Sequence, residues 1–265
     1  MSAMLLALGL GIMLYPKISD SINRMHSSEA VQSYSEQFCS ASEAELQRQL
    51  CTAQEYNERL LSVTDISEDS GADYYDILNF DSGMMGYIDI PDIDVRLPIY
   101  HGTDSKVLSK GVGHMPQTAF PIGGEGNHSV LTGHTGLPGA ELFTDLYKLD
   151  IGDTFSVTVM NETLTYEVDR IKTVLPTDST ELLPVEGEDY CTLLTCTPYG
   201  INSHRLLVRG HRTDEEGMQE DEAAFANGSK TAAAPPAAFV VISALSVLVT
   251  AWLALHRKRH KPQKT

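Results

Sequence analysis

The sequence predicts a mainly β domain, a closed or nearly closed antiparallel barrel, with helices before it and a membrane-spanning helix after it. Three observations support this prediction. Short β-rich runs separated by glycine and proline recur over residues 83–212, as they do in antiparallel barrels. Residues 17–61 are rich in Ser, Glu, Gln, Leu and Ala and contain few helix breakers. Residues 237–255 carry no charge and are long enough to span a bilayer as a helix.

Charge and length limit the class of protein. The 265 residues suffice for one sizeable domain with extensions. Lys and Arg total 19 against 36 Asp and Glu, a net charge of -17, although residues 257–265 are basic. An acidic body argues against nucleic-acid binding and is compatible with a basic partner that presents lysine. The same charge also serves solubility, so composition alone does not identify a partner.

The N-terminal segment, residues 1–16, contains the apolar run Met4–Tyr15 without a basic residue before it. The run is shorter than the roughly 20 residues of a full membrane span, so we expect part of an anchor or a weak signal sequence. Residues 17–61 are expected to be helical, packing on the domain or forming a stalk. The expected apolar stripe consists of Leu46, Leu50, Leu60 and Leu61.

Residues 62–82 form an acidic segment, and we expect Ser62–Phe80 to be mobile because acids gather there around Gly71. Six strands should follow before the last hairpin: Gly86–Ile90, Val95–Tyr100, Ser129–Thr132, Thr154–Met160, Leu164–Val168 and Ile171–Leu175. A tight hairpin turn is expected at Asn161–Glu162, since Asn tolerates positive φ.

After the barrel, residues 213–236 are acidic and then Ala-rich, which is typical of a solvated linker. Residues 237–255 are expected to cross the membrane as a helix, and residues 256–265 form a basic tail. Basic residues next to a span stay cytoplasmic. This pattern predicts a cell-membrane protein, single or double pass, whose domain lies outside the cell.

The most informative stretch is the hairpin predicted at the end of the barrel. Its β-rich runs are Tyr190–Thr197 and His204–Gly210, joined by a turn that contains Pro198, Gly200 and Asn202. Side chains alternate along a strand, so Thr192, Leu194 and Cys196 share one face, whereas Cys191, Leu193 and Thr195 share the other.

Cys196 ends the first run of this hairpin, and Arg205 begins the second. A thiol at a strand end faces loops, and a nearby cation favours its thiolate form. A buried structural role is the common alternative for a free cysteine, so a nucleophile also needs a base. His134 is the candidate, because it too lies where an apolar run gives way to a glycine-containing loop.

These residues belong to motifs that resemble the sortase family, most closely its class C, pilin-polymerising branch. The resemblance covers about Gly83–Arg212. It is carried by the stretch Thr192–Gly210 and by Thr132-Gly-His-Thr-Gly-Leu-Pro, Met85-Gly-Tyr-Ile-Asp-Ile-Pro, Leu97-Pro-Ile-Tyr-His-Gly-Thr and Gly111-Val-Gly-His.

The resemblance implies an eight-stranded barrel with short helices and a cysteine transpeptidase that needs no cofactor or metal. Cys196 would attack the threonine carbonyl of an LPXTG-like sorting signal, His134 would transfer protons, and Arg205 would hold the carbonyl oxygen. A lysine amine of another pilin subunit would then accept the acyl group. The resemblance also implies a lid over residues 62–82, where Asp65 corresponds to the family's lid aspartate but lacks the following proline and aromatic residue.

Three other functions compete with this hypothesis: a sortase that anchors proteins to the cell wall, a surface protein that only binds on a sortase-like barrel, and a papain-like protease. The last places its cysteine before its histidine, unlike this chain. A zinc site built from Cys191, Cys196 and His204 lacks the usual ligand spacing. Whether Cys39 and Cys51 pair stays open. Four other histidines and one arginine are expected to be structural or exposed rather than catalytic: His101, His114, His128, His204 and Arg209.

Overall fold

The computed structural model describes residues 2–61, 74–80, 83–137, 139–160 and 162–213. Contacts within the chain define a unit from Ser19 to Glu215 that contains every strand, whereas Met1–Ile18 belong to a second unit. The predicted linker after Thr213, membrane helix and basic tail lie outside the described residues. In the part of the chain that is described, no helix combines the length and apolar character needed to cross a membrane.

Two long helices precede the sheet: α1 (Ser2–Ser40) and α2 (Glu43–Leu61). The strands are β1 (Met84–Ile90), β2 (Val95–His101), β3 (Val112–His114), β4 (His128–Thr132), β5 (Thr154–Val159), β6 (Glu162–Val174), β7 (Tyr190–Thr197) and β8 (His204–Arg212). The short helical turns are η1 (Pro91–Ile93), α3 (Ser105–Leu108), η2 (Leu146–Lys148) and η3 (Thr180–Leu182).

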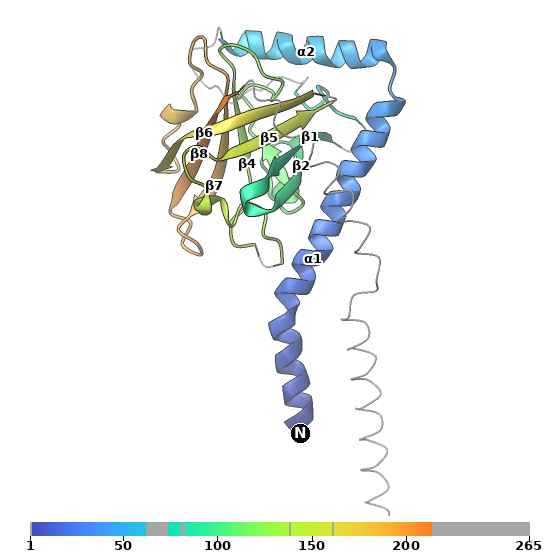
Figure 1. Ribbon diagram of the computed structural model, residues 1–265, viewed down its shortest axis with the longest axis vertical. Helices are drawn as coiled ribbons and strands as arrows, with labels where there is room; N and C mark the ends of the chain where they lie inside the picture. The colour runs from blue at the N-terminus through green and yellow to red at the C-terminus, as the bar shows by residue number, and fades with distance from the viewer. Residues whose placement is uncertain (1, 62–73, 81–82, 138, 161, 214–265) are drawn as a thin grey trace, which may run out of the picture. The chain divides into compact units, whose positions relative to one another are not determined.

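The strands close into a barrel in the order β1-β2-β3-β4-β7-β8-β6-β5, and Figure 1 shows the strands wrapped around one core. The predicted closed barrel is therefore confirmed. Six neighbouring pairs are antiparallel, but β2 pairs with β3, and β4 with β7, in parallel. The expectation of an antiparallel barrel throughout was wrong at these two pairs, because the long connections before β3 and β7 return the chain in the same direction.

The predicted strands differ from the observed ones in three places. The runs Leu164–Val168 and Ile171–Leu175 are one strand, β6, whose pairing with β8 shifts between Val168 and Arg170. Strand β3 was missed because it has three residues, one of them glycine. Glu162 already pairs with Val159, so the β5–β6 turn begins at Met160, whose φ is 58°; Asn161 lies outside the described residues.

The barrel interior is apolar. Inward-facing side chains of several strands form its core, among them Ile88, Ile99, Leu131, Phe155, Val157, Leu193 and Val208. Cys191 belongs to this core and is fully buried, and burial raises the pKa of its thiol. A second apolar cluster lies on the opposite face of β7 and contains Val130, Val174, Leu182, Leu194 and Leu207.

Helix α2 covers the barrel with a face that overlaps the predicted apolar stripe, since Leu60 packs against the barrel core. Its buried residues are Gln49, Ala53, Tyr56 and Asn57, whereas Leu46 and Leu50 are only half-buried and Leu61 is exposed. Two polar side chains, Gln49 and Asn57, are also buried on α2 because they bind main-chain groups of other segments. Asn57 donates to the Phe120 carbonyl at 3.1 Å and accepts from the Phe120 N–H at 2.7 Å.

The segment predicted to be acidic and mobile extends into the core at its C-terminal end. Tyr74, Ile77 and Leu78 are buried, so this end of the segment contributes side chains to the core. The Tyr74 hydroxyl lies 3.0 Å from His114 Nδ1. Apolar side chains drive this packing and outweigh the local acidity. Asp65 lies outside the described residues.

Candidate active site

Cys196 and Arg205 are direct neighbours across the β7–β8 hairpin. Both side chains therefore point to the same outer face of the barrel, with Cβ atoms about 5 Å apart in such pairs. Both residues are partly buried. The predicted hairpin is confirmed, and the pairing makes Cys196 and Arg205 cross-strand neighbours.

His134 follows β4 by two residues, and β4 lies parallel to β7 with Thr132 beside Leu194. The Gly133 N–H continues this ladder by donating to the Leu194 carbonyl at 3.0 Å. Since Cys196 is two residues beyond Leu194, His134 and Cys196 leave the sheet at the same end of adjacent strands, which are about 4.8 Å apart.

A buried hydrogen bond ties the two strand ends together next to these residues. Thr195 Oγ1 donates to the Gly133 carbonyl at 2.8 Å. Behind Gly133, the Phe143 ring leaves no space for a side chain, since a Cβ on Gly133 would lie 2.6 Å from Phe143 Cγ. Phe143 N–H also donates to the His134 carbonyl at 3.1 Å. The main chain around His134 is thus held from both sides.

The Arg205 guanidinium is oriented by main-chain carbonyls, with Nη1 donating to His204 at 3.1 Å and to Asn202 at 3.3 Å. Among the residues that the structure describes, no carboxylate forms an ion pair with Arg205, and no hydrogen bond joins Cys196 to His134. Catalytic hydrogen bonds are often long before substrate binds. The cation is consequently available to an oxygen of a ligand placed over Cys196.

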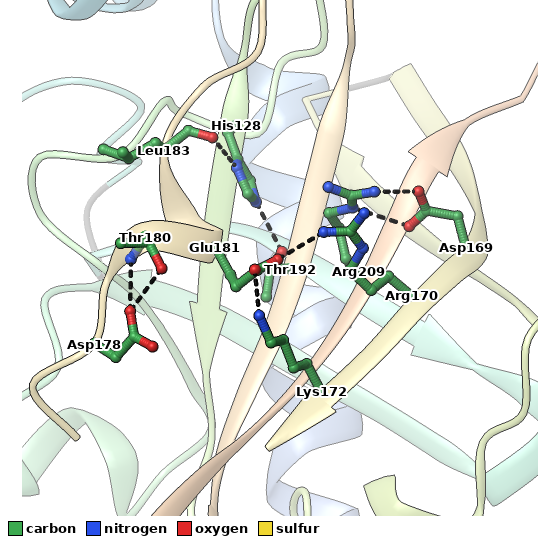
Figure 2. A network of polar contacts seen from close by, with 10 residues as sticks. All are labelled: His128, Asp169, Arg170, Lys172, Asp178, Thr180, Glu181, Leu183, Thr192 and Arg209. Carbon is green, nitrogen blue, oxygen red and sulfur yellow. Dashed lines mark hydrogen bonds and ion pairs between the residues drawn. The ribbon is translucent and has the colours of Figure 1, made fainter. Parts of the chain in front are cut away.

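The outer face beside the site carries a polar network from β4, β6, β7, β8 and the connection around η3. Glu181 pairs with Arg170 at 2.8 Å and with Lys172 at 2.5 Å, and Figure 2 shows its carboxylate within reach of both cations. Arg209 pairs with Asp169. It also lies over the Tyr190 ring, and Arg209 is therefore a structural ion-pair residue, as predicted.

His128 is part of the same network (Figure 2). Its Nε2 lies 2.7 Å from Thr192 Oγ1 and its Nδ1 lies 3.0 Å from the Leu183 carbonyl. Burial lowers the pKa of His128 and so favours the neutral ring. Together with Glu181, this histidine holds the β6–β7 connection against the barrel, beside the outward-facing side chains of β7 that include Cys196.

The other predicted structural histidines are buried or hydrogen-bonded locally. His101 and His114 end strands β2 and β3, and each ring nitrogen faces a main-chain or side-chain oxygen. His204 follows Ser203, whose hydroxyl lies 2.9 Å from its Nδ1. His204 precedes Arg205 on β8, so it faces the other side of the strand.

No group of three or more His, Cys, Asp or Glu side chains within the described ranges could hold a metal ion. Cys39 and Cys51 are free and exposed. Sequence reasoning missed Tyr199, which is largely exposed in the β7–β8 turn. Its ring lies against Gly136 of the loop after His134, since a Cβ on Gly136 would lie 2.8 Å from Tyr199 Cε2. No local pattern signals a contact between two loops so far apart in sequence.

The closed barrel thus carries Cys196, Arg205 and His134 at one end of the neighbouring strands β7, β8 and β4. The family model that matches this chain is the sortase domain, over residues 88–213. The chain belongs to the sortase family.

Solved class C sortases are its structural neighbours. Sortase C1 from Streptococcus agalactiae is 46% identical with a TM-score of 0.66, over 70% of this chain and 98% of that one. Sortase C from Clostridium perfringens, solved with a C-terminal cell wall sorting motif, is 42% identical with a TM-score of 0.64, over 71% of this chain and 100% of that one.

Other relatives match a smaller share of the chain. Sortase D of Bacillus subtilis is 31% identical over 131 residues, 48% of this chain. Sortase A of Streptococcus agalactiae is 32% identical over 117 residues, 43% of this chain. The matches span 63% and 47% of the lengths of these two relatives.

Proposed function

We propose that this protein is a class C sortase, a transpeptidase that joins pilin subunits through Cys196, His134 and Arg205. The observation that carries the proposal is the direct pairing of Cys196 with Arg205, at the strand end that β4 also reaches just before His134. Class C neighbours at 40–46% identity support it. No cofactor takes part in this chemistry.

In the first half of the reaction, the Cys196 thiolate attacks the threonine carbonyl carbon of an LPXTG-like sorting signal. The carbonyl oxygen becomes an oxyanion, which the Arg205 guanidinium stabilises; a preorganised donor of this kind typically lowers the barrier by about 3 kcal/mol. When the peptide bond breaks, His134 gives a proton to the departing amine. The acyl group is then held on Cys196 as a thioester.

In the second half, a lysine amine of another pilin subunit loses a proton to His134 and attacks the thioester carbonyl. The carbon–sulfur bond breaks, an isopeptide bond remains, and the Cys196 thiolate is regenerated. The acidic composition of the chain is compatible with approach of a basic, lysine-bearing surface. Orientation by Arg205 matters in both halves because the oxyanion forms twice.

The test is mass spectrometry of the full chain incubated with a sorting-signal peptide. A thioester on Cys196 is expected, and Cys196→Ala should form none and cleave nothing. Cys191→Ala is the matched control, since Cys191 lies on the opposite face of β7 in the core, and this variant should still form the thioester. Adduct formation on Cys191, or cleavage by Cys196→Ala, would contradict the assignment.

The acceptor is tested with the same adduct. A pilin domain with a free lysine should release the thioester as an isopeptide-linked product, whereas a cell-wall-precursor amine should do so much more slowly. The reverse preference would show a cell-wall-anchoring sortase. A chain that binds the peptide without ever forming the thioester would be a binding protein on a sortase-like barrel.

We also propose that the domain is held at the outer face of the cell membrane by residues 237–255, with residues 256–265 in the cytoplasm. The support is the uncharged stretch followed by basic residues. Protease added to intact cells should remove the barrel and leave the tail protected. Digestion of the tail with an intact barrel would refute this orientation.

A further inference from the structure

Helix α1 contacts the loop that follows His134 through three polar residues on one helical face. Asp20 Oδ1 accepts a hydrogen bond from the Glu141 N–H at 3.0 Å. Asn23 Nδ2 donates to the Gly139 carbonyl. Arg24 Nη2 pairs with Glu141 Oε2 at 2.6 Å. The spacing of three and four residues places all three side chains on the same face of the helix, and we call them the α1 latch.

The latch also reaches a second connection of the barrel. Arg24 pairs with Asp94, which ends η1 in a left-handed conformation between β1 and β2, and with Asp20 on its own helix at 3.1 Å. One guanidinium therefore bridges α1, the β1–β2 turn and the loop after His134. The planar fork of arginine donors suits such multiple pairing, whereas lysine offers one point charge.

The loop bound by the latch leads directly back to His134. Two residues beyond Glu141, the Phe143 N–H donates to the His134 carbonyl. The Gly136 N–H donates to Thr144 Oγ1 at 3.0 Å and closes the loop on itself. The loop that contacts α1 is short and internally hydrogen-bonded. It thus connects α1 to the main chain of His134, the proposed proton carrier.

Helix α1 and the loop after His134 are in close contact, and this contact is polar rather than apolar. A Cβ on Gly139 would lie 2.1 Å from Ser19 Oγ, so the loop main chain lies directly on the helix. A cavity of about 40 Å³ remains among Arg24, Asp94 and Glu141. Farther along the helix, Val31 and Tyr34 pack in an apolar cluster with β1. The helix thus stays docked through that cluster if the latch is removed.

We propose that Asp20, Asn23 and Arg24 are positioning residues that hold the loop after His134 and thereby place the His134 ring over Cys196. This inference rests on the proposed function. It predicts that removing the latch loosens residues 135–145 and slows the chemical step, while the barrel stays folded. A misplacement of about 1 Å at a reacting group can cost on the order of a hundredfold in rate.

The first measurement is hydrogen exchange of the full chain. In the triple variant Asp20→Ala/Asn23→Ala/Arg24→Ala, the Glu141 amide should exchange at least about tenfold faster, because its acceptor is lost. The Val168 amide, bonded to Asp153 within the barrel, should keep its wild-type rate. Unchanged exchange across residues 135–145 would overturn the proposal.

The second measurement is steady-state cleavage of the sorting-signal peptide. We expect kcat to fall about fivefold in Arg24→Ala and at least about thirtyfold in the triple variant, with KM changed less than about twofold. Arg24→Lys should recover part of kcat. Arg48→Ala is the matched control, since Arg48 forms an exposed ion pair with Glu45 on α2; it should match wild type.

The outcomes separate this inference from the proposed function. If the wild-type protein is active and the latch variants keep a normal kcat, the inference about the α1 latch is wrong and the proposed function still holds. Faster Val168 exchange in both the triple variant and Arg24→Lys would show a general structural role and also remove it. If wild type forms no thioester on Cys196, the proposed function fails and the inference fails with it.

Discussion

Acid should destabilise this protein through His114, and the size of the effect follows from its surroundings. His114 is fully buried. Its Nε2 lies 2.8 Å from the Ala119 carbonyl and its Nδ1 lies 3.0 Å from the Tyr74 hydroxyl, with the Phe120 ring stacked 5.0 Å away. A second proton would place a charge among aromatic rings, so burial lowers the pKa of His114 from 6.5 to about 3.

The sign follows from where the proton binds. The unfolded chain takes up the proton as the pH falls below 6.5, whereas the folded protein takes it up only near pH 3. The stabilisation is therefore present above pH 6.5 and is lost as the pH falls toward 3. Between pH 7 and pH 5 the loss of unfolding free energy from this one residue is about 2 kcal/mol.

Urea denaturation of wild type and His114→Gln at both pH values measures this effect. The glutamine variant starts less stable, but between pH 7 and pH 5 it should lose about 2 kcal/mol less than wild type does. Other titrating groups cancel in this comparison. His26→Gln, which removes an exposed histidine of α1, should lose as much as wild type. Equal losses for wild type and His114→Gln would refute the reasoning.

Three further predictions concern α2, the outer face and the lid. Asn57→Ala should cost about 2 kcal/mol in urea denaturation, since the Phe120 N–H loses its partner while the Phe120 carbonyl keeps the Ile122 N–H. Gln47→Ala, on the exposed side of α2, should cost less than about 0.5 kcal/mol, and similar costs would contradict the reasoning. Arg209→Ala should lower the free energy of unfolding by about 2 kcal/mol because the ion pair with Asp169 is lost, yet this variant should still form the thioester. A variant that folds but is inactive would show that Arg209 has a catalytic role. Asp65→Ala should raise thiol labelling of Cys196 less than about threefold, and a tenfold rise would show that Asp65 closes the site.

The sequence by itself determined the features that depend on neighbours along the chain. The β7–β8 hairpin is encoded by two β-rich runs and a turn, and strand alternation then puts Cys196 and Arg205 on one face. The placement of Cys191 on the face opposite Cys196 follows from the same alternation. Such local patterns survive in any fold that contains the hairpin, so they can be read without knowing the rest of the molecule.

Tertiary structure alone decided how distant segments meet. The parallel pairing of β4 with β7 puts His134 and Cys196 at the same end of adjacent strands. The union of two predicted runs into β6 depends on its pairing with β8. The burial of Gln49 and Asn57 on α2 and the contact of Arg24 with Glu141 were also invisible in the sequence. These contacts join residues tens of positions apart. Their energy comes from burial and from satisfying main-chain groups of other segments, which no local pattern specifies.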